Sequence, residues 1–164
     1  MAISQIPAAT AISGTLPVAN GGTGTSTAPC FSAYANALQS ITTQTTTLVN
    51  FGAKDWDTAS CYDTSTSKFT PNVAGYYQVN GAINASTTWT KAYLAVYKNG
   101  SVYKYGTDIS TSTFINTVQF NSLVYMNGTT DYIQLYCAVT GSSPQIYGGQ
   151  APYTWFQAAL VRTS

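Results

Sequence analysis

Short runs of alternating apolar and polar residues recur along most of the chain, and each run predicts a β-strand. In the run 76–83 the apolar face consists of Tyr77, Val79, Gly81 and Ile83. Successive side chains of a strand point to opposite faces, so this run predicts a strand with one buried face. Pro71 and Gly75 come just before it. Proline lacks the N–H that a central strand needs and glycine permits a corner, so we expect the strand to begin after them.

Further runs with the same period cover residues 31–35, 91–97, 102–105, 114–126, 131–139 and 153–161. Asn99-Gly100 and Asn127-Gly128 predict tight turns, because these dipeptides tolerate positive φ. The segments 54–67, 84–90, 107–113 and 141–152 are predicted as loops. In 114–126 the apolar positions change phase after Phe120, which predicts a β-bulge near Asn121.

No run has the period of a helix of three turns, and turn signals separate short strands at intervals of about eight to twelve residues. This pattern predicts an all-β sandwich or jelly roll. Residues 1–29 contain no aromatic and no charged side chain. We therefore expect two parts, an extended N-terminal segment over residues 1–29 and a globular domain over residues 30–164.

Charge is scarce in this sequence. Hydrophobic residues make up 45% of the chain, whereas charged residues make up only 7% and give a net charge of +1. Average proteins carry about a quarter charged residues, so a surface this neutral favours tight assembly over a free monomer. The six cationic residues are scattered, which argues against nucleic-acid binding. No apolar run is long enough for a transmembrane helix, and the N-terminus lacks the basic start of a secretory signal.

The sequence offers little for catalysis or cofactors. It has no His and no Glu, which excludes a Ser/His/Asp or Cys/His triad and zinc binding through His. Asp55 and Asp57 flank Trp56 and are the weak candidates for a glycosidase pair, and together with Asp63 for calcium. We expect neither an enzyme nor a cofactor. The Gly-rich stretch 21–24 lacks the lysine of a phosphate-binding loop.

Three cysteines are present. Cys137 lies in an apolar alternation and is predicted to be a buried small side chain. Cys30 and Cys61 either form a disulfide or remain free thiols, and the sequence leaves this open.

Aromatic side chains are the remaining candidates for binding. Aromatic rings stack on sugars and anchor protein interfaces. The candidate receptor-binding residues in or beside predicted loops are Trp56, Trp89, Tyr103, Tyr105 and Tyr147. The candidate trimer-interface residues, on the outward faces of two predicted strands, are Tyr93, Tyr97, Tyr132 and Tyr136.

The globular part resembles the C1q/TNF-like family. The signature is Phe69-Thr70-Pro71-Asn72-Val73-Ala74-Gly75-Tyr76-Tyr77-Gln78-Val79, and shorter matches are Phe31-Ser32-Ala33-Tyr34 and Leu94-Ala95-Val96-Tyr97-Lys98-Asn99-Gly100. This sequence departs from the family's Gly-Asp motif, because two residues are inserted between Gly128 and Asp131. The resemblance implies a jelly-roll sandwich of about ten antiparallel strands that forms a homotrimer, with the last strand central and buried.

The N-terminal segment resembles a second family. The run Gly14-Thr15-Leu16-Pro17-Val18-Ala19-Asn20-Gly21-Gly22-Thr23-Gly24 is similar to an element that recurs in tail-fibre and related virion-fibre proteins of bacteriophages. This resemblance implies a place in the virion after assembly in the host cytoplasm. Contact with other virion proteins is expected through Ile3, Ile6, Ile12, Leu16 and Val18.

Together these features indicate a short trimeric virion fibre or tip protein that binds a host-surface glycan or protein. Purely structural decoration of a capsid or tail, without receptor binding, is the main alternative. A polysaccharide-cleaving enzyme and a secreted eukaryotic C1q-like protein are further alternatives. The host, the receptor and the position on the virion are left open.

Overall fold

The computed structural model describes residues 28–111, 116–149 and 153–164. Every regular element of these residues is a β-strand. The strands are β1 (Cys30–Tyr34), β2 (Gln39–Ser40), β3 (Thr47–Leu48), β4 (Ala53–Asp57), β5 (Tyr62–Asp63), β6 (Lys68–Phe69), β7 (Ala74–Asn84), β8 (Trp89–Lys98), β9 (Ser101–Ser110), β10 (Thr117–Asn127), β11 (Ile133–Gly141), β12 (Gln145–Ile146) and β13 (Trp155–Thr163).

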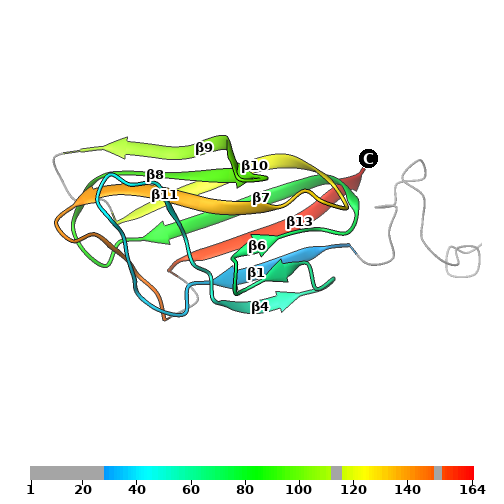
Figure 1. Ribbon diagram of the computed structural model, residues 1–164, viewed down its shortest axis with the longest axis horizontal. Helices are drawn as coiled ribbons and strands as arrows, with labels where there is room; N and C mark the ends of the chain where they lie inside the picture. Colours follow the sequence, from blue (N-terminus) through cyan, green and yellow to red (C-terminus); the bar gives the residue numbers. More distant parts are fainter. Residues whose placement is uncertain (1–27, 112–115, 150–152) are drawn as a thin grey trace, which may run out of the picture.

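The strands form two antiparallel sheets that pack face to face (Figure 1). The first sheet has the order β10-β7-β13-β1-β4, and the second has the order β5-β6-β11-β8-β9 with β3 also paired to β11. A small third pair joins β12 to β2. The terminal strand β13 lies in the middle of the first sheet, between β7 and β1, as the sequence predicts.

The core lies between the two sheets and is rich in aromatic rings. Phe31 of β1 stacks on Tyr62 at a ring distance of 4.4 Å and on Phe69 at 4.7 Å, and it meets Phe156 of β13 edge-on. The inward positions predicted for β7 and β11 are all buried or, for Gly81, closely packed against Leu135. Burial of these alternating side chains is the main force that fixes the sandwich.

Asp131 joins two turns at one end of the sandwich. Its carboxylate accepts hydrogen bonds from the Asn99 side chain at 2.7 Å and from the Asn127 backbone N–H at 3.0 Å, and it forms an ion pair with Lys98 at 2.8 Å. Asn99 and Gly100 both have positive φ, as the predicted β8–β9 turn requires. The two Asn-Gly turns are thus tied to each other by one carboxylate.

The bulge predicted near Asn121 is wrong. Strand β10 pairs with β7 in unbroken register from Thr117 to Asn127. Its inward positions run through Phe120, Val124 and Met126 without a shift of phase. The phase change in the sequence arises because apolar residues occupy outward positions in the second half of the strand.

All four predicted loops overlap strands, since the segment 84–90 includes the start of β8 and the segment 141–152 includes β12. The segment 54–67 includes most of β4 and all of β5, and β9 continues to Ser110 through residues predicted as loop. Strands β4, β5 and β9 lie at sheet edges, where only one side is paired and polar residues are tolerated. Their composition therefore resembles that of turns.

Candidate functional site

The outer face of the second sheet carries a group of interacting tyrosines. Tyr97 of β8 and Tyr136 of β11 lie with ring centres 4.1 Å apart, and Tyr93 meets Tyr105 of β9 edge-on at 5.4 Å. The Tyr93 hydroxyl is 2.6 Å from the Thr46 hydroxyl. These contacts fix the rings, so the face is a rigid aromatic surface rather than a set of free side chains.

A cavity of about 340 Å³ opens beside Tyr93. It is lined by Gln44, Lys91, Tyr93, Ala138 and Thr140. The lining comes from three separate segments: the loop before β3, the start of β8 and the end of β11. A volume near 300 Å³ is at the small end of ligand-binding pockets and suits one small ring or side chain.

Gln44 reaches this cavity from a strained backbone position. Its φ is +59°, a conformation that residues other than glycine adopt at a cost of about 1 kcal/mol or more. Two hydrogen bonds hold the loop in place, from Gln44 N–H to the Val139 carbonyl at 2.7 Å and from Gly141 N–H to the Thr43 hydroxyl at 3.3 Å. Ser60, Ser67, Asn99 and Ser143 also have positive φ, so this conformation places the Gln44 side chain at the cavity without by itself indicating a function.

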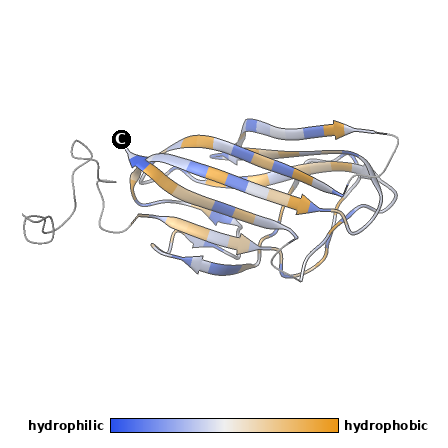
Figure 2. Cartoon of the chain, turned by 180° about the vertical axis from the view of Figure 1, so that it is seen from behind, coloured by the Kyte–Doolittle hydropathy of each residue, from blue (hydrophilic) through white to orange (hydrophobic). Residues whose placement is uncertain are grey.

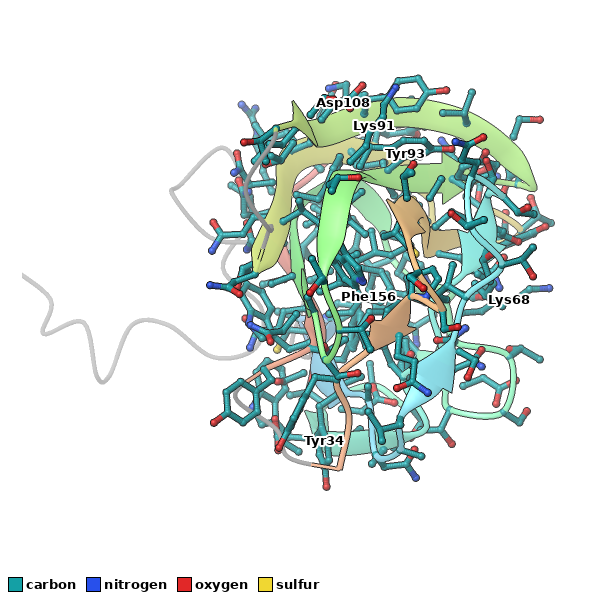
Figure 3. All side chains as sticks on the ribbon, turned by 90° about the vertical axis from the view of Figure 1, so that its left-hand side faces the viewer. Tyr34, Lys68, Lys91, Tyr93, Asp108 and Phe156 are labelled. Carbon is teal, nitrogen blue, oxygen red and sulfur yellow. The ribbon has the colours of Figure 1, made fainter. Side chains whose placement is uncertain are left out.

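Lys91 is the one charged residue of the lining, and Asp108 lies nearby. Asp108 faces Tyr93 across the β8–β9 pair, so both side chains are on the outer face, and Lys91 is two residues before Tyr93. Figure 3 shows Lys91, Tyr93 and Asp108 together at one side of the sandwich. Neither Lys91 nor Asp108 belongs to either ion pair found among the described residues.

The cavity lies at the end of the molecule far from residue 28. In Figure 1, β8 begins and β11 ends at the left, whereas β1 begins and β13 ends at the right. The pairing of Cys30 with Ala159 and of Gly141 with Trp89 fits this arrangement. The chain therefore enters the globular part at one end and presents the cavity at the other.

The outer face of the first sheet is a second distinctive surface. Its outward positions carry several exposed apolar side chains, namely Trp56, Tyr76, Leu123, Tyr125 and Val161. Tyr76 and Tyr125 are directly opposite each other on β7 and β10. Figure 2, drawn from behind, shows hydrophobic positions among the hydrophilic ones along the strands. Exposed apolar groups that cluster on one face typically mark an interaction surface.

The structure separates the predicted receptor-binding aromatics. Trp89 is fully buried as the first residue of β8, so its prediction as a displayed loop residue is wrong. The polar residues 84–88 make the segment read as a loop, but the chain re-enters the core at Trp89. Trp56 is exposed on β4, Tyr103 and Tyr105 are exposed on β9, and Tyr147 follows β12 beside Tyr153.

The tyrosines predicted for a trimer interface all lie half-buried at the second sheet. Tyr93, Tyr97 and Tyr136 are engaged in the ring contacts described above, and the Lys68 ammonium lies 4.3 Å from the centre of the Tyr132 ring. The residues predicted to contact the virion, Ile3 to Val18, lie outside the described residues. Sequence reasoning missed Gln44, Lys91, Asp108 and Thr140, because no motif connects these separate segments.

The acidic residues considered for catalysis or calcium do not converge. Asp55 accepts a hydrogen bond from the Ser32 hydroxyl at 2.8 Å, and Asp57 pairs with Lys54 at 2.9 Å. Asp63 accepts hydrogen bonds from Ser65 and Thr66, which lower the pKa of its carboxyl to about 2. Among residues 28–111, 116–149 and 153–164, no three His, Cys, Asp or Glu side chains are grouped for a metal ion.

All three cysteines are free thiols. Burial raises the pKa of the Cys137 thiol to about 12, as expected for an inert core residue. Burial also raises the pKa of Cys61. The disulfide between Cys30 and Cys61 that the sequence left open is therefore not formed in this structure.

Two antiparallel sheets with a central terminal strand define a jelly-roll sandwich. Similar solved structures include the globular domain of zebrafish complement 1qA, with 15% identity over 83% of this chain and 99% of that one, and a TM-score of 0.58. Murine APRIL gives 9% identity over 82% and 99%, with a TM-score of 0.62. The PRD1 vertex protein P5 gives 16% identity over 85% and 99%, with a TM-score of 0.60.

The chain therefore has the C1q/TNF-like jelly-roll fold that the sequence predicts. No protein-family model matches the sequence, and neither does any curated protein. None of the three similar structures is described as an enzyme. In the described part of the chain, no helix has the length and hydrophobicity needed to cross a membrane.

Proposed function

We propose that this protein is a homotrimeric virion fibre or tip protein of a bacteriophage, whose head binds a host-surface glycan or protein. The observation that carries the proposal is the group of exposed apolar side chains on the outer face of the first sheet. Leu123 is 51% exposed and Tyr76 is 47% exposed there, although both lie on long, regular strands. A trimer covers such a face, and closed symmetry leaves no copy of it open.

We assign the subunit contact to this face rather than to the tyrosines named from the sequence. The tyrosines named from the sequence are half-buried within the single chain, whereas Leu123, Tyr125 and Val161 are exposed, although Tyr125 also packs on Tyr76 at a ring distance of 5.5 Å. Trimeric assembly in this way leaves the second sheet and its cavity facing outwards. Likeness to C1q-like and APRIL heads supports an assembly of this kind.

Likeness to a vertex protein supports a place in the virion. The Gly-Gly-Thr-Gly element resembles virion-fibre segments, and we propose that residues Ile3 to Val18 contact other virion proteins. The globular part begins at the end of the sandwich opposite the cavity (Figure 1). This polarity suits a head that is held at one end and displays a binding site at the other.

Light scattering after size exclusion tests the assembly. A chain of 17.4 kDa is expected at three times that mass, and a monomer at micromolar concentration contradicts the proposal. Fluorescently labelled full-length protein tests adhesion. Saturable binding to host cells that unlabelled protein displaces supports it, and absence of binding to every susceptible host contradicts it.

The likeness to a vertex protein also favours a second candidate, a capsid or tail decoration without receptor binding. The two candidates differ in one measurement. A decoration protein binds purified virions that lack it but not host cells, whereas an adhesion head binds the cells as well.

A further inference from the structure

We propose that the cavity beside Tyr93 binds one carboxylate-bearing sugar unit, such as a uronic acid residue of a host-surface polysaccharide. This inference rests on the proposed adhesion function and names its site and ligand class. Two features of the described residues carry it: the chemistry of the cavity lining and the charge of Lys91.

The lining has the mixture of groups that a sugar ring needs. Ala138 and the Tyr93 ring offer apolar surface for the C–H side of a pyranose, while the Thr140 hydroxyl and the Gln44 amide offer donors and acceptors for its hydroxyls. The Tyr93 hydroxyl is already bonded to Thr46, so the ring is held in one orientation. A cavity of about 340 Å³ admits one ring rather than a chain of several.

The charge of Lys91 favours the binding of acidic sugars over neutral ones. Lys91 is the only charged group among the five lining residues, and no carboxylate lines the cavity. Its ammonium group forms neither of the two ion pairs found in the described ranges, which use Lys54 and Lys98. A ligand carboxylate would supply the missing opposite charge through a charge-assisted hydrogen bond.

Asp108 is the acidic group closest in register to the site, opposite Tyr93 on β9. It lies outside the lining, so it repels an acidic ligand from a distance without contacting it. A neutral sugar carries no charge for Asp108 to repel. Removal of the Asp108 charge therefore strengthens the binding of an acidic sugar and leaves the binding of a neutral sugar unchanged.

The test measures binding of free glucuronic acid and of glucose to the full-length protein by saturation-transfer NMR and calorimetry. Glucuronic acid is expected to bind with weak, millimolar affinity, and glucose is expected to bind at least about tenfold more weakly. Lys91→Gln should reduce glucuronic acid binding by about tenfold or more, and Asp108→Asn should strengthen it. Lys68→Gln, which changes a lysine of the same sheet outside the cavity, should leave binding unchanged.

Equal binding of the two sugars, or unchanged binding by Lys91→Gln, overturns the acidic-sugar site. Weaker glucuronic acid binding by Asp108→Asn overturns it as well, because a distant negative charge can only oppose an acidic ligand. Host-cell binding separates this inference from the proposed function. If Lys91→Gln and the unchanged protein bind host cells equally well, the proposed site is wrong and the adhesion function stands. If the unchanged protein binds no host cells, the adhesion function itself is rejected.

Discussion

Trp89 illustrates how a single residue changes role once its surroundings are known. It is completely buried, and within the described part of the chain its indole Nε1 has no hydrogen-bond acceptor. Trp89→Ala is expected to destabilise the protein by about 3–5 kcal/mol, because it leaves a large cavity in the core. Trp89→Phe keeps most of the packing and removes the unpaired N–H, so its loss should be smaller.

Urea unfolding followed by circular dichroism measures both Trp89 variants. Equal losses for Ala and Phe contradict this account of the residue. Any decrease in host binding by Trp89→Ala must therefore be corrected for the fraction of unfolded protein, since Trp89 has no exposed surface with which to contact a receptor.

Asp131 gives a prediction about pH. Burial alone would raise the pKa of its carboxyl, but hydrogen bonds from Lys98, Asn99 and the Asn127 backbone lower the pKa below the usual value. A carboxylate with a lowered pKa stabilises the folded state above its unfolded pKa, near 4, and this contribution is lost as the pH falls through the folded pKa. Asp131→Asn should cost about 1–3 kcal/mol at pH 7, since it leaves Lys98 without its counter-ion.

The difference in unfolding free energy between Asp131→Asn and the unchanged protein should be constant above about pH 5 and should shrink below about pH 4. Urea titrations at a series of pH values measure it. Asp63 has a pKa lowered to about 2, but it is present in both proteins, so its contribution cancels. A difference that grows towards low pH contradicts the role given to Asp131.

At the scale of elements, the β10–β11 turn has tighter steric limits than the β8–β9 turn. Gly128 has a φ of +72°, and a Cβ there would lie 2.3 Å from the Ala74 backbone nitrogen. Gly100 has a φ of +80°, but a Cβ there would meet only the Tyr132 hydroxyl at 3.4 Å. Gly100→Ala therefore incurs backbone strain of about 1–3 kcal/mol, and Gly128→Ala adds a backbone clash to the same strain.

Thermal unfolding of the two alanine variants tests this difference. Gly128→Ala should lower Tm clearly more than Gly100→Ala does. Equal shifts would mean that β7 moves away from the turn without cost, and the close approach of Gly128 to Ala74 would then not be a constraint on the fold.

The alternating pattern predicted the central strands because their inward faces are defined by burial alone. Val79, Leu135 and Phe156 lie where a period of two places them. The pattern failed at β10 and at the edge strands, where apolar residues face outwards or polar residues pair on one side only. Leu123 and Tyr125 misled the prediction because they are apolar but face outwards from the single chain, as residues of the proposed subunit contact would.

The candidate site could not be predicted in the same way. Gln44, Lys91 and Thr140 are brought together by the pairing of β8 with β11 and by the loop that crosses their ends. None of these residues is unusual in its own segment. The sequence analysis named Tyr93 only as a candidate for the trimer interface, and the polar residues of the lining come together only in the tertiary structure.

At the scale of the whole molecule, the two outer faces are expected to have different partners. In the proposed trimer, the first sheet presents Leu123 and Tyr125 to a sister subunit and the second sheet presents the cavity to solvent. Leu123→Asp should therefore convert the trimer to monomers without unfolding the chain, because Leu123 is 51% exposed in the single subunit and a buried, unpaired charge at an interface is strongly unfavourable.

Light scattering and circular dichroism of Leu123→Asp measure mass and fold together. Leu38→Asp is the matched control, since Leu38 is 58% exposed and lies outside the first sheet, and it should remain a trimer. Tyr132→Asp tests the contact named from the sequence. If Tyr132→Asp dissociates the trimer and Leu123→Asp does not, the tyrosines of the second sheet form the subunit contact. The cavity beside Tyr93 would then lie next to a sister subunit instead of facing a receptor.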